Sequence, residues 1–169
     1  MAFPFSVPAQ IYGELIYVST TLKSTVSGKS IQSSPAGVSG FLGYEVSENL
    51  AFDGALTTGI GTSDVTADGA SQRIPVSMKI NYGYGLYVKP KLKVYESTEL
   101  FARLGYTEAN FTTSAQSISI SDTKSDWAYG FGGSYYLNQR TSLNASWMRL
   151  YNKDGVTSDG LFLGLGYKF

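Results

Sequence analysis

The side chains that most often carry catalysis are missing from this sequence. Histidine and cysteine are both absent from its 169 residues. An imidazole is the usual base of a Ser-His-acid hydrolase near neutral pH, and a thiolate is the nucleophile or metal ligand that cysteine supplies. The sequence therefore excludes those mechanisms, together with disulfides and thiolate metal sites. The acidic residues show no ligand spacing, so we expect no metal and no cofactor.

Carboxylates remain as candidates for acid–base chemistry. Glu14, Glu45 and Asp53 each stand among apolar and aromatic residues, at positions that predict a shared, interior side of their strands. Two such groups could act as acid and base, but a buried carboxylate also needs a charged partner. Cations at matching positions are Lys79, Lys89, Lys91, Arg103 and Lys168. We predict an interior charge network of Glu14, Glu45, Asp53, Lys79, Arg103 and Lys168. We therefore expect that the protein is not an enzyme, and catalysis by carboxylates alone is the alternative.

The elements that must position these charges are β-strands. Bulky apolar residues alternate with small or polar residues through most of the chain, which is the period of a strand with one apolar face. The pattern predicts eight strands, over 10–23, 38–46, 50–57, 76–94, 100–106, 127–136, 142–147 and 161–169. Pro90 cannot donate to a sheet hydrogen bond, so we expect a bulge or a register break near it.

The final strand shows the pattern most clearly. Its odd positions carry Leu161, Leu163, Leu165, Tyr167 and Phe169, and the chain ends on that last aromatic residue. The even positions carry Phe162, Gly164, Gly166 and Lys168, so one face is apolar and the other is narrow around its two glycines.

The composition indicates whether lipid or water surrounds the barrel, and therefore where its apolar face points. Charged residues make up 15% of the chain and aromatic residues 14%, and no apolar run approaches the roughly 18 to 20 residues of a membrane-spanning helix. A soluble ligand-binding barrel would line a pocket with the apolar face and cover the other face with Lys and Glu. Here the other face is largely Gly, Ala, Ser and Thr, which favours lipid outside and a packed interior. The net charge is zero, so nucleic acid is not an expected partner.

The connections between strands alternate in length. Residues 47–49, 95–98 and 137–140 are predicted to form tight turns, whereas long polar loops are expected over 24–37, 59–73 and 112–125, with a shorter fourth connection over 152–158. Short turns at one end and long loops at the other indicate an all-β, eight-stranded antiparallel transmembrane β-barrel with short periplasmic turns and longer extracellular loops.

Three segments carry a resemblance to a known family. The first is Gly-Phe-Leu-Gly-Tyr-Glu-Val (40–46), followed by a turn and Leu-Ala-Phe-Asp-Gly-Ala-Leu (50–56). The others are Leu-Phe-Ala-Arg-Leu-Gly-Tyr-Thr (100–107) and the terminal Gly-Leu-Gly-Tyr-Lys-Phe (164–169). They resemble the small bacterial outer-membrane barrels, which include OmpX-like, Ail-like and opacity proteins and the OmpA transmembrane domain. The resemblance implies location in the bacterial outer membrane, with outer-membrane lipid as surroundings. It also implies an assembly signal, read by the barrel-assembly machinery, at Leu163, Leu165, Tyr167 and Phe169.

The domain organisation is predicted to be simple. We expect one transmembrane barrel domain over 1–169, with 1–9 as an N-terminal lead-in. The first residues show neither the basic nor the apolar region of a signal peptide, so we interpret the chain as a mature form, its signal peptide removed, with an added initiator Met.

Basic residues near the loop ends of the strands suggest a lipid partner. The candidates for contact with lipopolysaccharide phosphates are Lys23, Lys29, Arg73, Lys124, Arg149 and Lys153. Solvated loop charge is the equally simple explanation. For the whole protein, we predict a structural or surface-interaction role, similar to adhesion, in which the loops meet a host or surface ligand. The alternative is a narrow passive channel for small or apolar solutes.

Overall fold

A computed structural model describes residues 10–169 apart from 27 and 68–71, and the side chains of 26 and 72–74 are also outside the description. The predicted lead-in over 1–9 therefore lies outside the described residues. No described helix is long and apolar enough to cross a membrane. The strands are β1 (Gln10–Val26), β2 (Lys29–Ser33), β3 (Ala36–Ser47), β4 (Leu50–Gly59), β5 (Thr62–Ala67), β6 (Gln72–Tyr95), β7 (Thr98–Ala115), β8 (Ile118–Tyr136), β9 (Thr141–Lys153) and β10 (Val156–Lys168).

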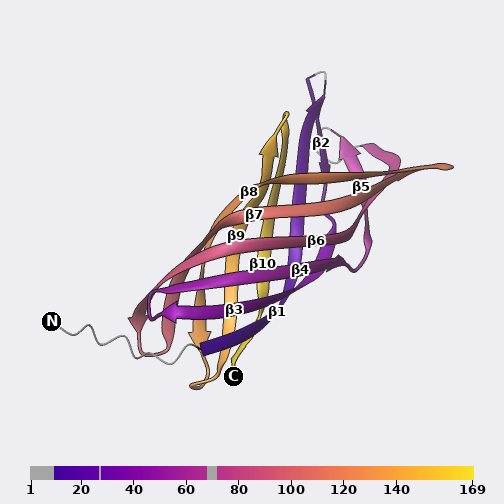
Figure 1. Cartoon of the computed structure of the whole chain (residues 1–169). Coiled ribbons are helices and arrows are strands. Elements are labelled where there is room, and N and C mark those ends of the chain that lie inside the picture. Colours follow the sequence, from indigo (N-terminus) through magenta and orange to yellow (C-terminus); the bar gives the residue numbers. More distant parts are fainter. Residues whose placement is uncertain (1–9, 27, 68–71) are drawn as a thin grey trace.

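Eight of these strands close into a ring (Figure 1). The order β10-β9-β8-β7-β6-β4-β3-β1 is antiparallel throughout, and β1 pairs with β10 from Tyr12↔Lys168 to Ser24↔Val156. The start of β1, the end of β10 and the short turns lie at one end, which we call the lower end. The predicted eight-stranded antiparallel barrel is confirmed.

Side chains alternate between the inside and the outside of this ring. In β1, Tyr12, Glu14 and Ile16 are buried, whereas Leu15 and Tyr17 are exposed. The same alternation leaves a belt of large apolar side chains on the outer surface of the other strands. An exterior that is apolar all round is typical of a barrel surrounded by lipid.

Three segments predicted as loops instead extend the barrel wall at its upper end. Strand β2 pairs with the upper part of β1, β5 pairs with the upper part of β6, and β2 and β5 pair with each other through Ile31↔Ala67. Residues 112–125 form a hairpin that turns between Ala115 and Ile118. The loop prediction is wrong here because hydroxyl side chains also suit paired strands, as the Thr112–Ser121 and Ser114–Ser119 contacts of 2.9 Å show.

The predicted break at Pro90 is also wrong. The offset between β6 and β7 is the same at Val88↔Leu104 and at Lys91↔Phe101, so the ladder only skips Lys89 and Pro90. The register instead shifts between Ile80 and Tyr82, and again between Lys93 and Tyr95. A missing N–H interrupts a ladder locally, whereas only an inserted residue changes which face the following side chains occupy.

Strands β8 and β9 separate in the upper part of the barrel. They pair only from Tyr136↔Ser142 up to Tyr129↔Arg149, and above that level β8 pairs with β7 alone. Figure 1 shows the β7–β8 hairpin leaning away from β9 and β10. One hydrogen bond still joins the two strands above the separation, from the Asn152 N–H to Asp126 Oδ2 at 3.0 Å.

Candidate functional site: a charged plug below an apolar cup

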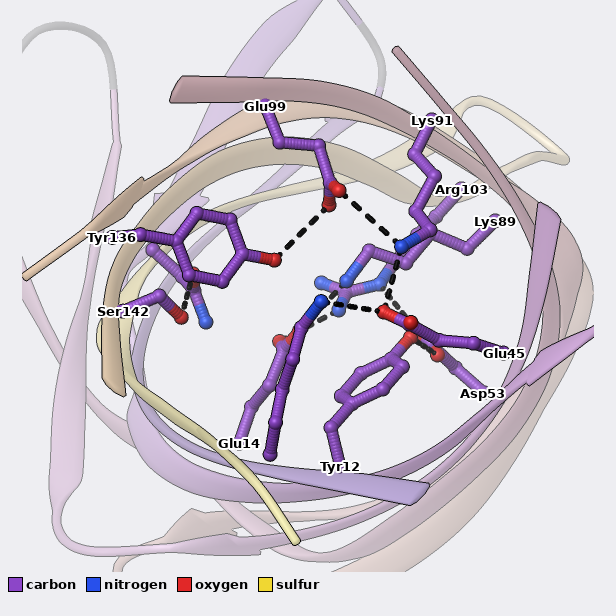
Figure 2. Close-up of polar contacts among 12 residues, drawn as sticks. Tyr12, Glu14, Glu45, Asp53, Lys89, Lys91, Glu99, Arg103, Tyr136 and Ser142 are labelled. Atoms are coloured by element: carbon purple, nitrogen blue, oxygen red, sulfur yellow. Dashed lines mark hydrogen bonds and ion pairs between the residues drawn. The ribbon is translucent and has the colours of Figure 1, made fainter. Parts of the chain in front are cut away.

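A buried arginine organises the lower half of the barrel interior (Figure 2). Arg103, on β7, donates from Nε to Asp53 Oδ2 at 2.7 Å and from Nη2 to Glu14 Oε2 at 2.6 Å. Lys89 Nζ donates to the second oxygen of Glu14 at 2.8 Å, and the Tyr12 hydroxyl donates to Asp53 Oδ1. Each of the two carboxylates is therefore held by two donors from other strands.

A second cluster lies beside the first, towards the lower end. Lys91 Nζ contacts Glu45 Oε1 at 2.6 Å and Glu99 Oε2 at 3.3 Å. Lys168, on the last strand, reaches the same Glu45 oxygen at 3.0 Å. The Tyr136 hydroxyl donates to Glu99 at 3.5 Å. Figure 2 shows these side chains pointing inward from several strands and crossing the lumen.

Together the two clusters contain four carboxylates and four cations. We call this set the plug: Glu14, Glu45, Asp53, Lys89, Lys91, Glu99, Arg103 and Lys168. Its formal charge is zero, and all of its members except Lys168 are buried. Buried charges are tolerated only when they are paired and hydrogen-bonded. Every member of the plug has an oppositely charged partner, although Arg103 Nη1 has no hydrogen-bond partner among the described residues.

Most of the predicted interior charges lie together inside the barrel, and one of them lies on the outside. Glu14, Glu45, Asp53, Arg103 and Lys168 all belong to the plug. The prediction for Lys79 is wrong. The bulge between Ile80 and Tyr82 reverses the alternation along β6, so Ile80 is buried and Lys79 is exposed.

Sequence reasoning missed Glu99 as a member of the plug. A signal was present, because Glu99 stands two and four positions before Phe101 and Arg103 and therefore shares their face of β7. Tyr12 stands in the same relation to Glu14. Extending each alternating segment by one more period would have found both residues.

An aromatic layer closes the plug from above. The ring of Phe41 lies 6.1 Å from that of Tyr87 and 6.4 Å from that of Phe162, measured between centroids. The guanidinium of Arg103 stacks over Phe41, with its central carbon 4.2 Å from the ring centroid. The layer therefore separates the charged lower interior from the space above it while making a favourable cation–π contact.

An apolar cavity of about 150 Å³ occupies the interior above the aromatic layer. We call it the cup. Its wall includes Val18, Ile80, Phe111, Leu150 and Phe162, with a few polar groups among them. Interiors of membrane barrels are usually polar, so this half departs from the common pattern. Among the described residues, no group of three or more carboxylates is placed to hold a metal ion.

Comparison with known proteins identifies the family to which this barrel belongs. The family model for the outer membrane protein β-barrel domain matches residues 2–169. The chain belongs to the outer membrane protein β-barrel family. A search of curated proteins finds no match.

Solved structures share the fold of this outer-membrane barrel at low sequence identity. Ail of Yersinia pestis is similar at 19% identity with a TM-score of 0.66, over 95% of this chain and 99% of that one. Neisserial surface protein A is similar at 15% identity with a TM-score of 0.67, over 94% and 97% of the two chains. OprG of Pseudomonas aeruginosa is similar at 14% identity with a TM-score of 0.59, over 95% of each chain.

Family membership orients this barrel in the bacterial outer membrane. Its short turns are periplasmic, so the plug fills the periplasmic half and the cup opens towards the extracellular side. The outer face of the β7–β8 pair marks the outer boundary of the membrane. Tyr106 and Trp127 pack edge to face at 5.9 Å, and the next outward pair above them is Glu108 and Ser125.

The basic residues predicted to contact lipopolysaccharide differ in their surroundings. Lys23, Lys29 and Lys153 are exposed, whereas the side chain of Arg73 lies outside the described residues. Arg149 is committed to Asp159 through two hydrogen bonds of 2.8 and 3.2 Å. Lys124 forms an ion pair with Asp122 at 2.7 Å, which raises the pKa of Lys124 and lowers that of Asp122.

The C-terminal residues predicted to form an assembly signal lie on the lipid-facing side of β10. Leu163, Leu165, Tyr167 and Phe169 are all exposed. The Phe169 N–H donates to the Ile11 carbonyl at 3.0 Å, so the last residue still takes part in barrel closure. Their recognition by the assembly machinery stays a prediction.

Proposed function

We propose that this protein is a non-conducting outer-membrane barrel that acts at the cell surface, in the manner of an adhesin, and without catalysis. The plug is the observation that carries this proposal. Its ion pairs cross the lumen, and the aromatic layer of Phe41, Tyr87 and Phe162 covers them. Arg103 binds both Glu14 and Asp53, so neither carboxylate is available as a free acid or base.

The upper extensions of the strands support a role at the surface. The β7–β8 hairpin rises beyond the Tyr106–Trp127 boundary, and its outward residues are Glu108 followed by Asn, Ser and Thr. An Ail structure from Yersinia pestis, with a TM-score of 0.66 to this chain, is described in complex with the heparin analogue sucrose octasulfate. By analogy, a surface ligand of this protein would meet the extracellular end of its barrel.

Planar-bilayer recording tests whether the lumen is closed. We expect no steady discrete openings from the wild-type protein. The paired change Glu14→Ala with Lys89→Ala removes one carboxylate and one cation, so it keeps the net charge while emptying part of the plug. This variant should show openings. Steady openings of the wild-type barrel would contradict the proposal.

The surface role is tested separately on whole cells. Removal of residues 112–121 shortens the hairpin without touching the plug. We expect cells with this variant to bind immobilised heparin several-fold less than cells with the wild-type protein, while the bilayer recording stays silent. Equal binding by the two kinds of cell would argue against the hairpin as the ligand-binding element.

Passive passage of small or apolar solutes is the second candidate. The apolar cup and the separation of β8 from β9 favour it, because residues of both strands line the cavity beside the point where their pairing ends. The plug opposes a direct route to the periplasm. The bilayer recording described above distinguishes this candidate from the first.

We also propose that exposed cations near the extracellular end bind the phosphates of lipopolysaccharide. Lys23 and Lys29 form no ion pair with the described residues, so their charge is free for a lipid. We expect Lys23→Gln with Lys29→Gln to weaken the binding of purified lipopolysaccharide several-fold at low salt. Lys93→Gln, at the exposed periplasmic end of β6, is the matched control. A change of equal size in the control would overturn the assignment.

A further inference from the structure

The cup is the feature that the proposed function leaves unexplained. We propose that it is a binding site for an apolar molecule about the size of one aromatic ring or the end of an alkyl chain, carrying one hydrogen-bonding group. The inference deepens the proposed surface function, because it names a ligand class for the extracellular half of the lumen. Four observations lead to it.

The first observation is that the outward face of the β7–β8 hairpin changes from apolar to polar along unbroken strands. Within the membrane the outward residues are apolar, as Leu104 and Tyr129 show, and Arg103 points inward. Above the boundary, Thr112 and Ser121 occupy the outward face, whereas Phe111 lines the cup. The register between the two strands does not shift, so the change on the outward face comes from the residue types and not from a bulge. The inward face above the boundary combines Ala109 and Phe111 with threonines and the Asp122–Lys124 ion pair, so this hairpin gives the cup apolar contacts beside a few polar groups.

The second observation is an unpaired hydroxyl in the wall. Ser158 is buried, its Oγ has no hydrogen-bond partner among the described residues, and it lines the cup. A buried polar atom without a partner is uncommon, since leaving it unsatisfied costs about 1–3 kcal/mol. A ligand hydroxyl, carbonyl or carboxyl group would satisfy it.

The third observation is a break in strand pairing beside the cup. Lys124 on β8 and Leu150 on β9 both line the cavity, and they lie on either side of the gap where the two strands separate. The gap begins at Tyr129↔Arg149, close to the outer membrane boundary at Trp127. Unpaired strand edges are not stable in hydrocarbon, so the gap must lie at the interface or above it. This break is the route by which an apolar molecule would reach the cup, from the outer leaflet or from the extracellular solution.

The fourth observation is size. The cup has a volume of about 150 Å³. In a soluble protein, an apolar cavity of roughly this volume accepts benzene and stays free of water. Apolar surface gains about 25 cal/mol for each Å² removed from water, so an apolar ligand of matching size is favoured over solvent.

Fluorine NMR on the full barrel in lipid nanodiscs tests the site. The probe is 4-fluorobenzyl alcohol, which has one ring and one hydroxyl group. We expect its signal to broaden or shift saturably beyond the effect of nanodiscs without protein. Ala109→Trp fills the cup from β7 and should abolish the added effect, whereas Ser121→Trp, on the outward face of the same hairpin, should retain it. An effect no larger than that of empty nanodiscs, or one that survives Ala109→Trp, would overturn the proposal.

A second variant keeps the test independent of whether the tryptophan variant folds. Ser158→Ala removes the unpaired hydroxyl, so we expect about fivefold weaker binding of 4-fluorobenzyl alcohol and unchanged binding of fluorobenzene. An equal loss for both probes would contradict the assigned hydrogen bond. None of these results depends on the bilayer recording, so a failure of this site and a failure of the closed-lumen proposal are separable.

A third arm identifies the source of the ligand. A phospholipid with fluorine on its terminal acyl carbon is placed in the same nanodiscs. A shifted lipid signal that disappears in Ala109→Trp would assign the site to acyl chains from the membrane. A response from the free alcohol alone would assign it to small molecules from solution. If neither probe responds, the cup does not bind this class of molecule.

Discussion

The same barrel wall encloses two halves of the lumen, and the two halves differ in what fills them. The periplasmic half holds four carboxylates and four cations within hydrogen-bond reach of one another. The extracellular half holds a cavity with an apolar wall. The periplasmic half is filled by side chains that join opposite walls of the barrel, whereas the extracellular half leaves a cavity between them.

The comparison teaches that the position of a residue along a strand decides its role as much as its face does. Arg103 and Phe111 share the inward face of β7, eight residues apart. The first is locked into ion pairs, and the second lines an open cavity. Changes in the lower half should therefore affect stability, and changes in the upper half should affect binding.

The largest effect is expected for Arg103→Ala in the plug. It leaves Glu14 and Asp53 buried without their main partner, which should lower the free energy of unfolding by about 3–5 kcal/mol. Urea unfolding in lipid vesicles measures it. The matched change in the upper half is Lys124→Ala, which breaks an exposed pair and should have no measurable effect on stability. Similar losses for both variants would remove the distinction between the halves.

An intermediate effect is expected at the layer between the halves. Phe41→Ala should lower the free energy of unfolding by about 3 kcal/mol, because it removes a buried ring and leaves a cavity beneath the cup. Leu42→Ala is the neighbouring control, since lipid fills the space outside the barrel and only the transfer contribution is lost. If the two losses are equal, the aromatic layer does not act as a packed boundary.

The smallest effect is expected where β8 and β9 separate. Asp126→Ala removes the acceptor of the Asn152 N–H, so this amide should exchange with solvent roughly tenfold faster. Global stability should change little, because the ladder from Tyr129 downward is untouched. Hydrogen exchange measured by NMR in nanodiscs checks both points. Unchanged exchange at Asn152 would mean that this hydrogen bond does not hold the upper strands together.

Much of the fold and of the plug was accessible from the alternation of residues. A period of two assigns each side chain to a face, and this rule alone placed Glu14, Asp53 and Arg103 in one interior. The rule failed at Lys79, where one bulge in β6 reverses the faces. In the upper hairpin the Ser- and Thr-rich composition predicts a loop, but these residues pair across strands.

The cup was not accessible in this way. Its wall combines Val18, Ile80, Phe111, Leu150 and Phe162 from distant strands, and one of them faces inward only because of the β6 bulge. The break in strand pairing beside the cup lies at the level where β8 leaves β9, and no residue type marks that level.

The sequence by itself determined the closed barrel, the lipid-facing side and the identity of most interior charges, because those follow from local alternation and composition. Tertiary structure alone decided which charges meet, where bulges reverse a face, and that the upper interior is an apolar cavity. The physical reason is that ion pairs and cavities depend on strand register and on the separation of strands, which arise only when the ring closes.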